Sequence, residues 1–106
     1  MRGFAHRIDE NQPELVSAFR AMGCSVWITS RLGQGAPDLV VRKFSQVRLI
    51  EVKNPKKPPS ERALTKDEQE FQKAWAPVYH VIETAEQAHQ LVAEMTLKER
   101  LDGQAG

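Results

Sequence analysis

The sequence has few of the features that would place it in several large classes of protein. Cys24 is its single cysteine, so the chain can form no internal disulfide and offers no Cys/His cluster for a zinc site. We find no signal peptide and no apolar run long enough to cross a membrane. These absences fit a protein of a reducing cytosol, and we expect a cytoplasmic location.

A chain of 106 residues holds one domain, residues 1–106, and leaves no room for two of ordinary size. Hydrophobic residues make up 41% and charged residues 27%, which is the balance of a globular protein rather than a disordered one. The core of so short a chain is small, which favours burial of further surface against a partner subunit. We expect the core over about residues 7–95 and a frayed tail over about residues 101–106.

The net charge of +1 conceals an uneven distribution along the chain. Residues 42–66 contain eight Lys or Arg and two Glu, whereas residues 67–106 contain three Lys or Arg and eight Asp or Glu. A basic middle is a possible footprint for a polyanion such as DNA. Charge alone favours the alternative, a solvated basic face.

Apolar periodicity and the residues that interrupt it predict the order helix, three strands, helix, strand, helix. The strands are expected at 25–29, 38–42, 47–53 and 78–82, and the helices at 9–22, from Thr65 to Pro77, and from Thr84 onward. Asn11 or Asp9 would cap the first helix, with Glu14 reaching back to Asn11, and Thr65 and Glu68 would form a capping box on the second.

The connections between these elements suggest how the sheet is built. Residues 54–63, rich in proline and lysine, are predicted to form a loop. A short turn over residues 43–46 makes the second and third strands an antiparallel hairpin. The second helix can act as a right-handed crossover that places the fourth strand parallel to its neighbour. The predicted fold class is therefore α/β, a small mixed sheet flanked by helices.

Two carboxylates are expected to face each other across the hairpin. A symmetric turn between Phe44 and Ser45 pairs residues whose numbers sum to 89, so Asp38 faces Glu51, with Cβ atoms about 5 Å apart. Two carboxylates at that distance repel each other unless a cation lies between them. A turn one residue longer would break the facing pair.

Lys53 projects from the same face as Glu51, because side chains two residues apart on a strand share a face. A lysine beside a bound metal can orient or deprotonate an attacking water and offset charge on a phosphate. The backbone carbonyl of Val52 could complete the metal shell. Glu-x-Lys alone is common as a solvated ion pair on exposed strands, but burying Asp38, Glu51 and Lys53 in strands this apolar is costly unless they share a site.

Three segments together resemble the virus-type replication-repair nuclease (VRR-NUC) domain, a branch of the PD-(D/E)XK nuclease superfamily. They are Gly35-Ala36-Pro37-Asp38-Leu39-Val40-Val41, Leu49-Ile50-Glu51-Val52-Lys53 and Leu64-Thr65-Lys66-Asp67-Glu68-Gln69-Glu70-Phe71. Residues 7–12 resemble the opening of that domain and residues 75–83 its closing strand, so the resemblance covers about residues 7–95.

The resemblance implies a restriction-endonuclease-like PD-(D/E)XK core and a metal-dependent, structure-selective DNA endonuclease that hydrolyses phosphodiester bonds. Asp38, Glu51 and the Val52 carbonyl would bind Mg²⁺, for which Mn²⁺ would substitute, and Lys53 would be the catalytic lysine. Glu14 matches an acidic position that reaches the metal shell through water; the alternative is a helix-capping glutamate. Gln69 matches a polar position near the active site; the alternatives are an exposed glutamine, or Glu68 as the relevant residue.

The resemblance also implies partners. Stand-alone members of the family are similar to phage and bacterial Holliday-junction resolvases and tend to be homodimers, which implies branched DNA as substrate, a homodimer, and the cytoplasm of a bacterium or phage host. Other members cut flaps or act as general DNA endonucleases. A non-catalytic nucleic-acid-binding module and a protein-interaction subunit are the alternatives from other classes.

Basic and glycine-rich segments beside the predicted site are candidates for DNA contact. Lys56, Lys57, Arg62 and Lys66 follow the strand that carries Lys53 and would bind phosphates without reading sequence. Arg31 and the backbone of Gly33, Gln34 and Gly35 could cradle a phosphate. The alternatives are a flexible basic loop and a plain turn. Trp27, Phe71 and Trp75 are expected in the core rather than as platforms on which bases stack.

Overall fold

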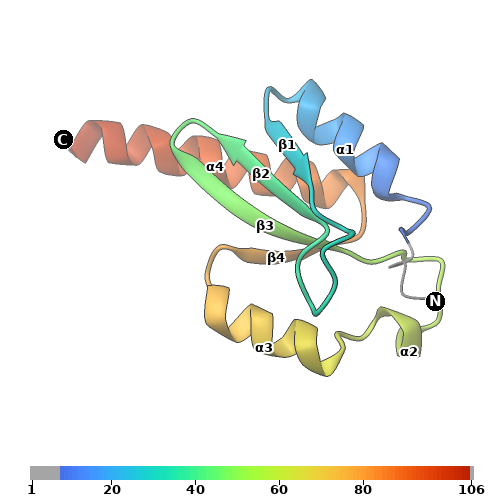
Figure 1. The fold of residues 1–106 in the computed structure, drawn as a ribbon. Coiled ribbons are helices and arrows are strands. Elements are labelled where there is room, and N and C mark those ends of the chain that lie inside the picture. Colours follow the sequence, from blue (N-terminus) through green and yellow to red (C-terminus); the bar gives the residue numbers. More distant parts are fainter. Residues whose placement is uncertain (1–7, 106) are drawn as a thin grey trace.

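A mixed sheet of four strands lies between two layers of helices in the computed structural model, which describes residues 8–105 (Figure 1). The strands, in the spatial order β1-β2-β3-β4, are β1 Ser25–Ile28, β2 Leu39–Lys43, β3 Gln46–Val52 and β4 Tyr79–Ile82. The helices are α1 Gln12–Ala21, α2 Pro59–Arg62, α3 Lys66–Trp75 and α4 Ala85–Ala105. No helix in the described part of the chain is long and apolar enough to span a bilayer.

The pairing of the strands confirms the predicted topology and register. β1, β2 and β3 form an antiparallel meander, and β4 returns parallel to β3 after the crossover through α3. In the β2–β3 hairpin Leu39 pairs with Ile50 and Lys43 with Gln46, so the paired numbers sum to 89 as expected from a turn at Phe44 and Ser45. Phe44 takes a left-handed conformation, with φ of 59°, to close this turn.

The two faces of the sheet are covered differently. α1 and α4 pack together on one face and enclose the hydrophobic core, whereas α3 lies against the other face beside β4 (Figure 1). The core is contributed by both helices and by strands β2, β3 and β4, with Leu15, Phe19, Leu39, Val41, Ile50, Ala88 and Met95 each at 0% exposure. Because strand side chains alternate, Asp38, Val40, Leu49, Glu51, Lys53 and Tyr79 lie on the α3 face.

Several local expectations are corrected by the structure. Asn11 precedes α1 but makes no side-chain capping bond, so the proposed Asn11–Glu14 capping box is wrong. The segment predicted to be all loop contains the short helix α2, and α4 continues to Ala105, past the point where fraying was expected. The Thr65–Glu68 capping box on α3 is confirmed, with both reciprocal hydrogen bonds formed.

The tryptophans are not in the core, contrary to expectation. Trp27 is 65% exposed and Trp75 is 50% exposed, and Ala74 on α3 is exposed as well. Phe71 is half-buried, where its ring stacks on Trp75 and meets Tyr79 at a tilt. The α3 face of the sheet is thus covered near β4 and open near β1, since a single short helix cannot span four strands.

Candidate active site

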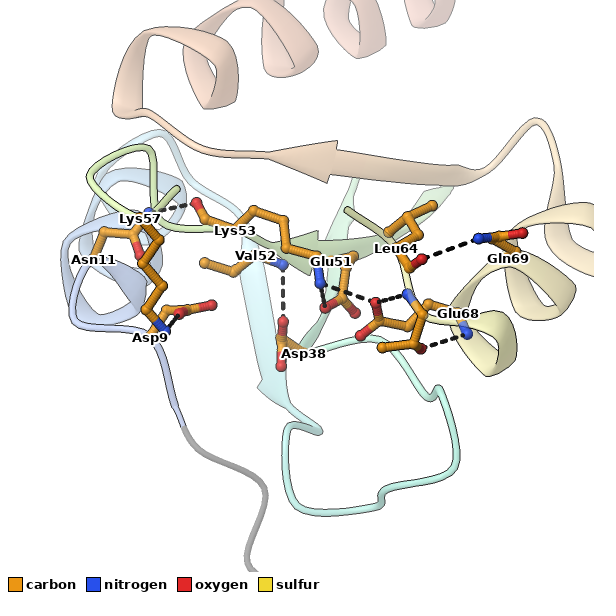
Figure 2. A network of polar contacts seen from close by, with 11 residues as sticks. Asp9, Asn11, Asp38, Glu51, Val52, Lys53, Lys57, Leu64, Glu68 and Gln69 are labelled. Carbon is orange, nitrogen blue, oxygen red and sulfur yellow. Dashed lines mark hydrogen bonds and ion pairs between the residues drawn. The ribbon is translucent and has the colours of Figure 1, made fainter. Parts of the chain in front are cut away.

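Four ionisable side chains gather on the α3 face where β2 begins and β3 ends. Asp38 precedes β2, Glu51 lies in β3, Lys53 follows β3, and Glu68 reaches in from the first turn of α3 (Figure 2). We refer to these four residues as the carboxylate–lysine cluster. Each is buried, with exposure between 2% for Asp38 and Glu51 and 8% for Lys53. Buried charged groups are costly unless they interact with one another or with a ligand.

The hairpin register holds Asp38 beside β3. The Asp38 N–H donates to the carbonyl of Ile50 at 2.9 Å, so the backbone of Asp38 bonds to β3 although the regular pairing of the two strands begins at Leu39. Oδ2 of Asp38 accepts a hydrogen bond from the Val52 N–H at 2.8 Å (Figure 2). This bond to the backbone fixes the carboxylate against the end of β3, alongside Glu51.

Lys53 lies between two carboxylates. Its Nζ is 2.9 Å from Oε1 of Glu68 and 3.6 Å from Oε2 of Glu51 (Figure 2). Two acidic partners on separate elements, β3 and α3, therefore hold one ammonium group. The charge-assisted hydrogen bond to Glu68 orients the lysine strongly in this buried site, and the contact with Glu51 is an ion pair.

The start of α3 positions Glu68. The same oxygen that meets Lys53 also accepts from the Thr65 N–H at 2.9 Å, while the Glu68 N–H donates to the Thr65 hydroxyl. The loop before Asp38 packs tightly against this turn: a Cβ at Gly35, whose φ is +81°, would lie 2.6 Å from the backbone carbonyl of Asp67. Glycine at position 35 thus lets the loop and the helix approach closely.

The cluster carries more negative than positive charge when all four groups are ionised, with three carboxylates against one ammonium. Burial, together with the charges of Asp38 and Glu68, raises the pKa of Glu51 from 4.5 to about 10. Oε1 of Glu51 is buried and has no hydrogen-bond partner within the described residues. A buried carboxylate oxygen without a donor is what a missing proton or cation would satisfy.

The Lys53–Glu68 pair has opposite pKa shifts on its two members. Burial lowers the pKa of Lys53, but the hydrogen bond to Glu68 and the nearby carboxylates outweigh it, so the net shift is upward. Burial raises the pKa of Glu68, but its bonds to Lys53 and Thr65 outweigh that effect and the net shift is downward. Both shifts favour an ammonium beside a carboxylate at neutral pH.

Tyr79 adjoins the cluster from β4 and was not anticipated from the sequence. Its hydroxyl is buried and lacks a hydrogen-bond partner among residues 8–105. Burial, followed by the charges of Glu51, Glu68 and Asp38, raises the pKa of Tyr79. A signal was present: a tyrosine hydroxyl in a short buried strand needs a partner, and the parallel register of β4 on β3 puts that strand beside the cluster.

Asn11 ties the ends of β3 and β4 together. Its Nδ2 donates to the carbonyl of Lys53 at 3.0 Å and to the carbonyl of Glu83 at 2.8 Å. Lys57 pairs with Asp9 at 2.8 Å nearby. The segment that leads into α1 therefore anchors the backbone directly after the cluster.

The remaining predicted site residues lie outside the cluster. Gln69 is exposed and donates to the Leu64 carbonyl, so of the two neighbours it is Glu68 that contacts Lys53. Glu14 is exposed on α1 and borders a surface pocket with Asn54, Lys56 and Glu83. Asp38 and Glu51 do not line that pocket.

The basic candidates differ in how they are engaged. Lys57 pairs with Asp9, and Arg62 pairs with Glu83 at 3.4 Å and donates to the Lys57 carbonyl. Lys56 and Lys66 are exposed. In the loop before β2, Arg31 is exposed, and Gly33, Gln34 and Gly35 follow one another in left-handed conformations.

Within residues 8–105 no three His, Cys, Asp or Glu side chains are grouped as a metal site. Asp38 and Glu51 supply two carboxylates, and the third of the cluster, Glu68, is bound to Lys53. Comparison of the chain with protein-family models, with curated proteins and with solved structures found no match in any of the three.

Proposed function

We propose that this protein is a metal-dependent endonuclease that hydrolyses phosphodiester bonds in branched DNA. The observation that carries the proposal is the burial of Asp38, Glu51 and Lys53 side by side at the end of one hairpin. Structural charge pairs seldom leave an excess of carboxylates in the interior. A carboxylate of raised pKa, such as Glu51, beside a buried lysine is typical of a catalytic centre.

The resemblance to the VRR-NUC branch of the PD-(D/E)XK nucleases supports the same reading. Its three segments are distant in sequence, yet each contributes to the carboxylate–lysine cluster: the first supplies Asp38, the second Glu51 and Lys53, and the third Glu68. A mixed four-stranded sheet flanked by helices is also the architecture that the resemblance implies.

The residues of the cluster fit a Mg²⁺ ion, or Mn²⁺ in its place. Oε1 of Glu51 is buried without a hydrogen-bond partner among the described residues, and the charge of Asp38 repels it, a repulsion that a cation would relieve. The Val52 N–H points toward Asp38, and in a strand the carbonyl of the same residue faces the same side, so this carbonyl is a suitable third oxygen. Mg²⁺ requires only one or two carboxylates because it retains several waters. A bound ion would polarise the phosphodiester and acidify a water.

The protein side chains have separable roles in this proposal. Lys53, held between Glu51 and Glu68, is placed to donate a hydrogen bond to a phosphate oxygen and to orient the attacking water. Glu68 fixes the lysine and keeps it charged, and therefore acts as a positioning residue. Glu14 and Gln69 are exposed and would take part only through water or after substrate binds.

DNA would be held by the exposed basic residues around the cluster. Lys56 and Lys66 are exposed, on the loop after β3 and at the start of α3. Lys57 and Arg62 are paired with acids and would have to exchange partners to bind phosphate. Contacts of this kind give affinity that falls with salt and carry no sequence preference. Arg31 and residues 33–35 would extend the same surface.

Holliday-junction resolution by a homodimer is the specific activity that we propose, with cleavage of flaps or of DNA in general as the alternative. Two active sites related by symmetry suit paired nicks in a four-way junction. A binding module without catalysis would have no need of an excess of buried carboxylates at Asp38 and Glu51.

Cleavage of a substrate panel tests the proposal. Four-way junctions, flaps, splayed arms and duplexes are incubated with the full chain and Mg²⁺, alongside Asp38→Asn. The matched control is Glu70→Gln, an exposed carboxylate on α3 two residues from Glu68. We expect cleavage by the unmodified chain and by the control, and a loss of at least about 100-fold in Asp38→Asn. An unmodified chain that binds these DNAs but cuts none would refute the enzyme and favour the binding module.

A further inference from the structure

The outer edge of the sheet, at β1, has an unusual composition for an exposed strand. Among residues 8–105, β1 pairs with β2 on one side and with no strand on the other (Figure 1). Residues 22–30 contain no charged residue and no proline. Trp27 is 65% exposed and Ile28 is 48% exposed. Soluble proteins usually protect such an edge with lysine, proline or a bulge, because its open backbone groups can pair with another strand.

The pairing of β1 with β2 determines which backbone groups are open. The Thr29 N–H donates to the Asp38 carbonyl, so Thr29 and Asp38 are a hydrogen-bonded pair. Hydrogen-bonded and non-hydrogen-bonded pairs alternate along an antiparallel ladder, which makes Ile28 and Val26 non-hydrogen-bonded toward β2. Their N–H and C=O groups therefore point to the open edge.

We propose that β1 pairs antiparallel with the β1 of a second copy. In the proposed register, the numbers of any two residues that face each other across the interface sum to 54. Val26 then faces Ile28 of the partner copy, and Ile28 faces the partner's Val26, so all four open N–H and C=O groups on each strand edge find partners. Trp27 lies on the two-fold axis and faces its own equivalent. A register summing to 52 or 56 would use only part of these groups.

Charge and shape favour a second copy over another partner. In this register Arg31 faces Gly23 of the partner copy, so no like charges are directly opposed. A groove of about 360 Å³ adjoins the edge on the α1 side; its lining is mainly apolar, with Ile8, Pro13, Val16 and Ile28, and also includes Gln12, Ser17 and Arg20. Stable dimers bury about 800 Å² on each partner, and this groove with Trp27 adds apolar surface that four strand residues alone would lack.

The pairing would also arrange the two carboxylate–lysine clusters. A two-fold axis through an edge-to-edge strand pair is perpendicular to the sheet, so both copies present the α3 face to the same side. Trp27 and Asp38 are on that face. Two cutting sites would then meet one DNA junction from one side, a consequence that rests on the proposed nuclease function, whereas the dimer itself does not.

Cysteine cross-linking tests the register in the full chain carrying Cys24→Ala. The Cα atoms of a non-hydrogen-bonded antiparallel pair are about 4.5 Å apart, within the range of about 4.4–6.8 Å that a disulfide spans. Trp27→Cys should give a covalent dimer on mild oxidation. Ser25→Cys is the control, because Ser25 is exposed on the same face as Trp27. In the proposed register the Ser25 residues of the two copies are offset by four residues along the strands, so their Cα atoms are about 14 Å apart. Cross-linking of Ser25→Cys as readily as of Trp27→Cys, or of neither, overturns the proposal.

Sedimentation without DNA or metal provides a second test. We expect the unmodified chain to dimerise, and Trp27→Glu to raise the dimer Kd at least about tenfold, because it opposes two carboxylates and removes buried indole surface. Mixing Trp27→Glu with Trp27→Lys should restore a heterodimer. A dimer untouched by Trp27→Glu would overturn the interface and leave the nuclease proposal standing. A monomeric unmodified chain would overturn the interface and the homodimeric resolvase, and would leave metal-dependent DNA cleavage standing. Absence of cleavage by an intact dimer would overturn the nuclease proposal and leave the interface standing.

Discussion

Replacing Glu51 with glutamine should make the metal-free protein more stable at alkaline pH and less sensitive to pH, while abolishing cleavage. Burial and the charges of Asp38 and Glu68 raise the pKa of Glu51 to about 10 in the folded chain, against 4.5 when it is free. Between these values the folded state holds a proton that the unfolded state has released. Stability from this group is therefore complete below pH 4.5 and is lost progressively as pH rises toward 10.

The size of the effect follows from the linkage of one proton. A full proton difference changes the free energy of unfolding by about 1.4 kcal/mol per pH unit. The pKa of Glu51 in the unfolded chain lies below pH 6 and its pKa in the folded chain lies above pH 8. Up to about 2.7 kcal/mol of the free energy of unfolding should therefore be lost between pH 6 and pH 8. Glutamine cannot ionise and has nearly the same shape, so the Glu51→Gln protein should lack this slope.

Urea denaturation in EDTA at pH 6, 7 and 8 measures the difference between the two proteins. Comparing the pair cancels other titrating groups, such as His80, whose pKa is lowered by burial and by Arg48 and whose contribution has the opposite sign. Glu14→Gln, an exposed carboxylate on α1, is the control and should retain the slope of the unmodified chain. Added Mg²⁺ should stabilise the unmodified chain at pH 8 and leave Glu51→Gln unchanged, because the ion favours an ionised carboxylate.

Equal pH dependence in the unmodified chain and in Glu51→Gln would contradict a raised pKa at Glu51. It would mean that the unfavourable environment of Glu51 is relieved in solution, by water or by movement of Asp38. Stabilisation of both proteins by Mg²⁺ to the same extent would separately remove Glu51 from the ion site.

Three further predictions concern residues around the cluster. Gly35→Ala should destabilise the fold by at least about 2 kcal/mol in urea denaturation, because the new Cβ would lie 2.6 Å from the backbone of Asp67. Gly33→Ala, where φ is +72° and nothing lies within 4 Å of the new Cβ, should cost about 1 kcal/mol. Equal losses of stability in the two variants would contradict the close approach at Gly35. Glu68→Gln keeps the capping box but removes the anionic partner 2.9 Å from Lys53, which lowers the pKa of Lys53. The cleavage rate should therefore fall at least about tenfold, and the alkaline limb of the pH–rate profile should move to lower pH. An unchanged pH–rate profile would exclude Glu68 as a positioning residue. Lys56→Ala and Lys66→Ala should each reduce the slope of log binding constant against log salt concentration for DNA by about 0.9. Lys98→Ala, on α4 and paired with Asp102, should leave that slope unchanged. Equal slopes in all three variants would show that DNA binds at another surface.

Local sequence was sufficient for the order of the elements other than α2 and for the register of the β2–β3 hairpin. The hairpin turn at Phe44 and Ser45 fixes the register, because a two-residue connection leaves one way to pair the flanking strands. The Thr65–Glu68 capping box likewise depends on residues three apart. Alternation along β2 and β3 then places Asp38, Glu51 and Lys53 on one face.

Contacts between distant segments decided what the local pattern left open. The rotation of α3 against β4 turns Glu68 toward Lys53 and leaves Gln69 in solvent. The two strand-end carbonyls orient the Asn11 amide through its Nδ2, and its Oδ1, the atom that would cap α1, has no hydrogen-bond partner within residues 8–105.

The exposure of Trp27 was also beyond local inference. An apolar residue on a strand is buried only if something covers that face, and α3 lies at the far edge of the sheet, beside β4. Patterns within a few residues therefore specify the strands, the three longer helices, the hairpin register and the chemical groups of the candidate site. Which neighbour each of these groups meets depends on how helices and strands remote in sequence pack together.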